Sequence, residues 1–161
     1  MRNALFILLF VVCLVACRHS VVTEADYHVV PLPQQIDINQ EGEGFTLTNH
    51  MRIMVVDEAL SASAGYLANQ LQQLIGVNLS VEKEPSKDTK GDIHCELGLL
   101  HENKEAYSIR VDTSGIRVKA VTPEGIFRAV QTLLKSVRSV SSDAVYFPSA
   151  LLSRQSGLIA L

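Results

Sequence analysis

The sequence lacks several of the features that assign a function directly. Its 9 glycines are dispersed and form neither GxGxxG nor GxxxxGKS/T, so no phosphate-binding loop is predicted. Its 14 lysines and arginines are scattered and the formal net charge is −3, which disfavours a nucleic-acid groove. No segment repeats with a period of about 20 to 50 residues, which excludes a solenoid. With 47% hydrophobic and 19% charged residues, the chain is that of one ordinary globular domain.

Patterns for catalysis and metal binding are missing as well. No GxSxG motif is present, so a nucleophile elbow is not predicted. His94 and Cys95 would be neighbours on a strand and point to opposite faces, so they cannot easily bind one metal. No histidine is paired with another four positions away among His19, His28, His50, His94 and His101.

Two local patterns invite a catalytic interpretation but do not support it. HENKE, at 101–105, differs from the zinc motif HExxH in its last residue and lies in a polar stretch before a strand. The adjacent carboxylates Asp57 and Glu58 fit the start of a helix, where negative charge is stabilising by about 0.3–1 kcal/mol. The residues therefore predict no catalytic, cofactor-binding or metal site.

The N-terminus has the pattern of an export signal. Arg2 precedes an apolar run of 13 residues, 4–16, which is shorter than the roughly 20 residues that span a bilayer. LVAC, at 14–17, resembles the lipobox of bacterial lipoproteins. That resemblance implies a signal peptide over 1–16, lipidation of Cys17 and membrane anchoring by several acyl chains. Arg18 stands where an aspartate would favour the inner membrane, so we expect an exported lipoprotein of the outer membrane or periplasm. An ordinary secretory signal cut elsewhere is the alternative.

The cysteines are then accounted for. Cys13 would leave with the signal and Cys17 would carry the lipid. Cys95 alone remains in the folded part, and one thiol cannot form an internal disulfide. The fold is therefore not expected to depend on disulfides despite its export.

Apolar periodicity predicts the elements of the first half. After a polar tether over 17–26, a proline-interrupted edge piece is expected at 27–36. Strands are expected at 44–49, 51–57, 77–83 and 92–98. A helix is expected between the second and third of these, started by Asp57 or Ser61 and ended by Gly76. Its apolar face is formed by Leu60, Ala64, Leu67, Leu71 and Leu74.

The clearest local unit is a hairpin followed by a helix. The stretch 106–121 alternates apolar and polar residues about a turn at 112–115, in which Gly115 can adopt a positive φ. Arg110, Arg117 and Lys119 are expected to face water. Thr122 caps the next helix and Pro123 takes its first position. The apolar stripe of that helix is expected to be Ile126, Phe127, Val130, Leu133 and Leu134.

This order predicts an α+β domain over residues 27–137, with a mixed or antiparallel sheet and two helices on one face. Residues 138–161 fall outside the pattern and are expected to be a linker.

The segment from Tyr27 to Leu134 resembles the N-terminal accessory domain of bacterial β-N-acetylhexosaminidases, the family 20 glycoside hydrolases. The resemblance is carried by YHVVPLPQQI, by FTLT and above all by NKEAYSIRVDTSGIRVKAVTPEGIFRAVQTLLK. It implies an α+β layer, sometimes called zincin-like, that binds no zinc and no other cofactor. In the family this domain lies beside a catalytic (β/α)₈ barrel of the same chain. An adjacent Asp-Glu pair of that barrel assists attack by the substrate's own acetamido group on terminal N-acetylglucosamine or N-acetylgalactosamine residues.

The 161 residues depart from the family where the barrel would begin. A barrel needs about 250 residues, and 161 − 134 leaves 27 after Leu134. Asp57 and Glu58 lie in the wrong domain to be the catalytic pair, so no catalytic residue carries over. We therefore expect a non-catalytic, truncated part of a β-N-acetylhexosaminidase, inactive alone, that meets glycans only through a barrel. A stand-alone surface lipoprotein that binds glycans or a partner is one alternative. The accessory domain of another exported glycoside hydrolase, such as an α-glucuronidase or a family 84 hexosaminidase, is another.

Overall fold

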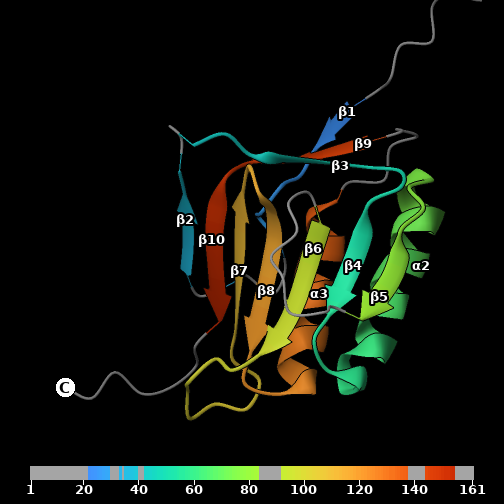
Figure 1. Cartoon of the computed structure of the whole chain (residues 1–161). Coiled ribbons are helices and arrows are strands. Elements are labelled where there is room, and N and C mark those ends of the chain that lie inside the picture. The colour runs from blue at the N-terminus through green and yellow to red at the C-terminus, as the bar shows by residue number, and fades with distance from the viewer. Residues whose placement is uncertain are drawn as a thin grey trace, which may run out of the picture.

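The protein is described by a computed structural model that places residues 22–29, 33, 35–39, 42–83, 92–137 and 144–154. Within these residues, a seven-stranded sheet has the order β2-β10-β7-β8-β6-β4-β5, and a three-stranded sheet has the order β1-β9-β3 (Figure 1). The helical elements are η1 (Glu58–Leu60), α2 (Ser61–Ile75) and α3 (Pro123–Ser136). The strands are β1 (Val22–Glu24), β2 (Gln35–Ile38), β3 (Phe45–Thr48), β4 (Arg52–Val55), β5 (Ser80–Lys83), β6 (Asp92–Leu97), β7 (Tyr107–Asp112), β8 (Gly115–Ala120), β9 (Ala144–Phe147) and β10 (Ala150–Arg154).

The seven-stranded sheet is mixed, and both α-helices cover the same face of it. Strands β5, β4, β6 and β8 run parallel to one another, whereas β8, β7, β10 and β2 alternate in direction. Helix α2 packs on β4 and β5, α3 packs on β6, β7 and β8, and the two helices contact each other. Figure 1 shows both helices behind the sheet. The predicted α+β class with two helices on one face is confirmed.

The helix boundaries follow the predicted signals. Asp57 caps η1, because its carboxylate accepts a 2.9 Å hydrogen bond from the Ala59 amide, and α2 continues from that turn. Gly76 ends α2 at φ +75°, a conformation that favours glycine. The Thr122 side chain accepts a hydrogen bond from the Gly125 amide at the start of α3, and Pro123 follows it.

The β7–β8 hairpin also forms where the sequence predicts it. Asp112 pairs with Gly115, which leaves a two-residue turn between them. Gly115 has φ +138°, and a Cβ there would lie 2.3 Å from the Asp92 carbonyl oxygen on β6. Glycine is therefore required twice, by the backbone angle and by the close approach of a neighbouring strand.

The expected apolar stripe of α3 was wrong at Phe127. This side chain is 38% exposed, and its ring lies 5.7 Å, centre to centre, from the ring of Tyr66 on α2. Ala129 is buried in the core instead, together with Ile126, Val130 and Leu133. Phe127 lies on the flank of the stripe, where it contacts the neighbouring helix rather than the sheet.

The boundaries expected for the domain were also too narrow at both ends. Val22–Glu24, expected within the tether, forms β1 and pairs with β9. The segment after 137, expected to be a linker, supplies β9 and β10 between 144 and 154. Strand β10 lies between β2 and β7, with Ala150 and Leu152 buried in the core. These strands were missed because each is short and its pairing partners are distant in sequence.

Candidate functional site

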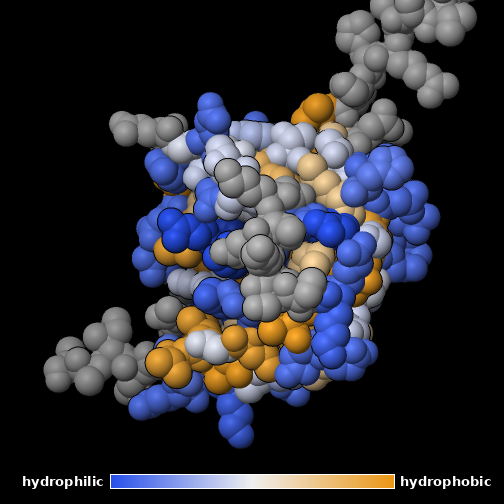
Figure 2. All heavy atoms as spheres, viewed as in Figure 1, coloured by the Kyte–Doolittle hydropathy of each residue, from blue (hydrophilic) through white to orange (hydrophobic). Residues whose placement is uncertain are grey.

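The face of the seven-stranded sheet without helices carries the charged side chains of the central strands. Because side chains alternate along a strand, residues between the buried core positions of β6, β7 and β8 project to this face. Figure 2 shows hydrophilic residues along the upper and right-hand parts of this face and a hydrophobic patch along its lower part. Arg110 and Lys119 are exposed and Arg117 is half-buried, which confirms the predicted polar side of the hairpin. Lys119 pairs at 2.8 Å with Glu96 on β6.

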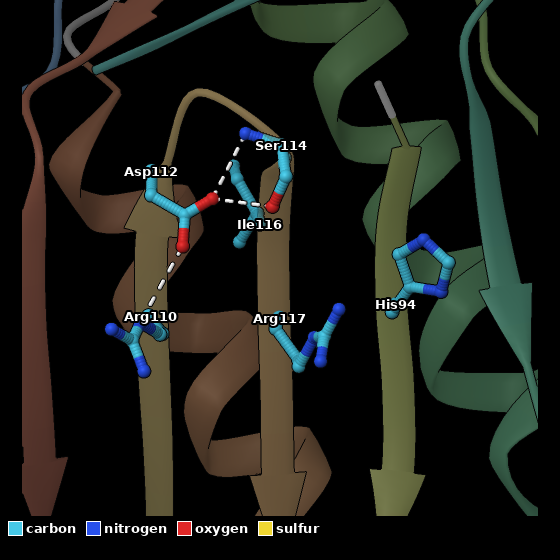
Figure 3. Close-up of a pocket in the computed structure, with 7 residues that line it drawn as sticks. His94, Arg110, Asp112, Ser114, Ile116 and Arg117 are labelled. Atoms are coloured by element: carbon cyan, nitrogen blue, oxygen red, sulfur yellow. Dashed lines mark hydrogen bonds and ion pairs between the residues drawn. The ribbon is translucent and has the colours of Figure 1, made fainter. Parts of the chain in front are cut away.

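A hollow of about 210 Å³ lies on this face near the hairpin turn. Strand register sets Arg110 directly opposite Arg117 and sets Arg117 beside His94. Figure 3 shows the three side chains in a row across β7, β8 and β6. The hollow is lined by His94, Arg110, Asp112, Ser114, Gly115, Ile116 and Arg117.

Asp112 is the fixed negative charge of the hollow. Its carboxylate accepts hydrogen bonds from the Ser114 amide, at 2.9 Å, and from the Ser114 hydroxyl, and it lies 3.4 Å from Nε of Arg110 (Figure 3). The Ser114 hydrogen bonds, with the charges of Arg110 and Arg117, hold the pKa of Asp112 below its ordinary value despite partial burial. A carboxylate with a lowered pKa is a weaker base than an ordinary aspartate, which disfavours activation of the Ser114 hydroxyl. The arrangement provides charge and hydrogen bonding but no nucleophile and base.

The other candidates from the sequence have structural roles in the described residues. His94 lies on the open face and Cys95 in the core, as predicted for neighbours on a strand. Burial raises the pKa of the Cys95 thiol to about 12, which leaves it unreactive. His101 lies in the loop between β6 and β7, and its Nδ1 accepts a hydrogen bond from the Asn103 amide, so HENKE forms no helix. Cys17, the predicted lipidation site, lies outside the described residues.

Neither metal binding nor a membrane helix finds support in the part of the chain that the structure describes. There, no three His, Cys, Asp or Glu side chains come together in a way that could hold a metal ion. None of the helices described is both long and apolar enough to cross a membrane.

The polar hollow was not predicted as a site. The sequence indicated that Arg110, Arg117 and Lys119 face water, but not that His94 joins their row. The alternation of polar and apolar residues in DIHCEL, at 92–97, contained that signal, since it places His94 on the opposite face to Ile93 and Cys95. The sequence did not predict that β6 lies beside β8, and this pairing is what brings His94 next to Arg117.

The fold is an α+β layer domain with two helices on one face of a mixed sheet, and the comparisons with known proteins assign it to a family. The model of glycosyl hydrolase family 20, domain 2, matches residues 26–150. This match spans more than half of the 161 residues, so the chain belongs to that family. No curated protein matches the chain.

Solved structures of family 20 enzymes share the fold. The exo-β-N-acetylglucosaminidase of Vibrio harveyi is 18% identical, with a TM-score of 0.66 over 86% of this chain and 20% of its own. The N-acetyl-β-hexosaminidase of Streptomyces plicatus, solved with thio-NAglucal, is 23% identical, with a TM-score of 0.67 over 81% of this chain and 26% of its own. The β-N-acetylhexosaminidase of Streptomyces coelicolor A3(2) is 22% identical, with a TM-score of 0.67 over 80% of this chain and 26% of its own. The chain thus spans about a fifth to a quarter of the length of these structures.

Proposed function

We propose that this domain serves a β-N-acetylhexosaminidase that removes terminal N-acetylglucosamine or N-acetylgalactosamine residues from glycans. The observation that carries the proposal is the match of glycosyl hydrolase family 20, domain 2, over residues 26–150. The fold shared with the Vibrio and Streptomyces enzymes supports it. The described residues offer a rigid layer rather than a reaction centre, so the chemistry is assigned to a catalytic barrel beside the domain.

The proposal is tested by activity and by the adjoining gene sequence. The purified 161-residue chain is expected to release no nitrophenol from a nitrophenyl N-acetylglucosaminide. Turnover that survives repurification would overturn the assignment of the chemistry to a barrel. The DNA next to codon 161, read in all frames, is expected to encode a barrel with an adjacent Asp-Glu pair. A barrel of another glycosidase family there would instead favour a different exported hydrolase.

Anchoring through Cys17 is part of the same proposal. It is supported by the apolar run at 4–16 and by LVAC at 14–17. Val22, the first residue of β1, follows Cys17 by only five positions, so a lipid on Cys17 would hold the domain close to a membrane surface.

Lipidation is tested by mass spectrometry of the chain from the membrane fraction of a bacterial host. The N-terminal peptide is expected to begin at Cys17 and to carry diacylglyceryl and acyl groups. Cys17→Ser is expected to abolish this mass and release the chain from membranes, whereas Cys13→Ser leaves both unchanged. A peptide that begins elsewhere without lipid would show an ordinary secretory signal.

A further inference from the structure

A second hollow, of about 270 Å³, lies between α3 and the ends of β7 and β10, on the helix-covered side of the sheet. Four residues of α3 contribute to it at i, i+3, i+4 and i+7, which places them on one face of the helix. These are Arg128, Gln131, Thr132 and Lys135. Tyr107 of β7 and Arg154 of β10 complete the lining. Because Arg154 is paired in register with Tyr107, both side chains lie on the same side of the sheet as α3.

The floor of this hollow is fixed by buried hydroxyl groups. The hydroxyl oxygens of Tyr107 and Thr132 lie 2.7 Å apart, and the Thr132 hydroxyl donates to the Arg128 carbonyl oxygen at 3.2 Å. The Tyr107 hydroxyl is then the donor to Thr132. Both residues are buried, at 2% and 7% exposure. The hollow therefore has a rigid polar base joining β7 to α3.

The charges around this floor are of one sign. Arg128, Lys135 and Arg154 line the hollow, and no carboxylate is among its lining residues. Arg128 forms an exposed pair with Glu105 at 3.2 Å. Lys135 lies in the last turn of α3, where the helix dipole favours a cation. Each of these two cations thus has a structural explanation of its own.

Arg154 has no such explanation. It is half-buried, and within the described residues its guanidinium takes part in no ion pair or side-chain hydrogen bond. A guanidinium held partly out of water, in a hollow lined by two other cations, is unfavourable unless an anion accompanies it. Arginine presents a planar fork of donors that matches the oxygens of carboxylate, sulfate and phosphate groups.

We propose that this hollow binds a small oxyanion, with Arg154 as its main ligand and Arg128, Lys135 and the Gln131 amide around it. The volume is below the roughly 300–1,000 Å³ of pockets that enclose drug-sized molecules, so it fits one charged group rather than an oligosaccharide. The oxyanion can be a free ion or a substituent of a sugar, such as a sulfate ester or a uronate carboxylate. This binding is independent of the catalytic assignment proposed above.

The test is an NMR titration of the full chain, followed at the Arg154 Nε–H and Gln131 side-chain amide signals. Inorganic sulfate, glucuronate and N-acetylglucosamine 6-sulfate are the probes, and N-acetylglucosamine is the neutral control. Saturable shifts with at least one anion and none with the neutral sugar are expected, and added sodium chloride is expected to weaken them. If the sulfated sugar binds more tightly than sulfate, the ligand is a substituent of a sugar. If the two bind equally, the ligand is a free ion. Either result supports the proposal.

Variants locate the site. Arg154→Gln is expected to lower the affinity at least tenfold, a loss typical of a charged hydrogen bond. Lys135→Gln changes an exposed position and is expected to lower the affinity about threefold to tenfold. This variant tests the site if Arg154→Gln does not fold. Arg110→Gln removes an arginine from the opposite face of the sheet and should leave the affinity unchanged. No saturable shift with any of the three anions would overturn the proposal, as would full affinity in both Arg154→Gln and Lys135→Gln.

Discussion

The phenol hydroxyl of Tyr27 donates a 2.6 Å hydrogen bond to the carbonyl oxygen of Pro148, 121 positions further along the chain. Two backbone hydrogen bonds accompany it, from the Ala25 amide to the Tyr146 carbonyl oxygen at 2.7 Å and from the Asp26 amide to the Ser136 carbonyl oxygen at 2.8 Å. These contacts hold the first described residues against the last residue of α3 and against the segment that carries β9 and β10. The domain is thereby closed by residues from both ends of its sequence.

Tyr27→Phe removes the hydroxyl from this closure and leaves the partly buried Pro148 carbonyl without its donor. We expect the free energy of unfolding to fall by about 1–2 kcal/mol, the usual cost of an unsatisfied acceptor. Urea unfolding at pH 7, followed by circular dichroism, measures this change. An unchanged unfolding midpoint would show that water replaces the hydroxyl without cost.

The same residue gives a pH dependence. Burial, helped by the neighbouring Tyr146 and Glu24, raises the pKa of Tyr27 far above its ordinary value of 10.0. Above pH 10 the unfolded chain loses this proton while the folded chain keeps it, so stability falls as pH rises. Cys95, with a pKa raised from 9.0 to about 12, acts in the same direction. We therefore compare the double variant Tyr27→Phe/Cys95→Ala with the single variant Cys95→Ala. Between pH 8 and 11, the free energy of unfolding should fall less steeply in the double variant. Parallel curves would contradict the assignment to Tyr27.

Local signals predicted more of this fold than distant ones did. The cap at Thr122, the end of α2 at Gly76 and the turn before Gly115 each depend on a few neighbouring residues, and each was predicted. Strand β10 depends on pairing with β2 and β7, which its five residues alone could not reveal. The row of Arg110, Arg117 and His94 was missed for the same reason, because it exists only once β6 lies beside β8.

Arg52 connects two carboxylates of very different exposure and so allows a matched comparison. It pairs with Asp92 on β6 at 2.6 Å and with Glu82 on β5 at 3.4 Å. The Asp92 side chain is 5% exposed and also accepts from the Arg52 backbone amide at 3.1 Å, whereas that of Glu82 is 45% exposed. Asp92→Asn is expected to lower the free energy of unfolding by about 1.5–3 kcal/mol, the usual contribution of a hydrogen bond to a charged group. Glu82→Gln is expected to change it by less than about 0.5 kcal/mol. Similar losses in both variants would mean that burial does not determine the strength of these pairs.

Comparison with Gly98 separates the effect on stability of the positive φ of Gly115 from the effect of its close contact with β6. Gly98 also has a positive φ, +120°, but a Cβ there would meet no atom within 4 Å. Gly98→Ala is therefore expected to cost only backbone strain, about 1–2 kcal/mol. Gly115→Ala adds a clash with the Asp92 carbonyl oxygen and is expected to cost about 1–3 kcal/mol more. Thermal unfolding of the two variants measures the difference. Equal losses would indicate that β6 and β8 separate easily enough to admit a methyl group.

Tyr66 and Phe127 form an exposed aromatic pair on the helices, at 41% and 38% exposure. An uncovered apolar surface of this kind is typical of a domain that packs against a neighbour, whereas a stand-alone binding module would present a polar outer face. We expect the chain to bind an apolar fluorescent dye, and Tyr66→Ser with Phe127→Ser to lower that signal at least twofold. Tyr66→Phe keeps both rings and should leave the signal unchanged. Because both substituted side chains lie largely outside the core, the double variant should lose no more than about 1 kcal/mol of stability. Dye binding by the double variant equal to that of the unaltered chain would show that the dye binds elsewhere. Absence of dye binding by the unaltered chain would favour a stand-alone module over a domain that packs beside a barrel.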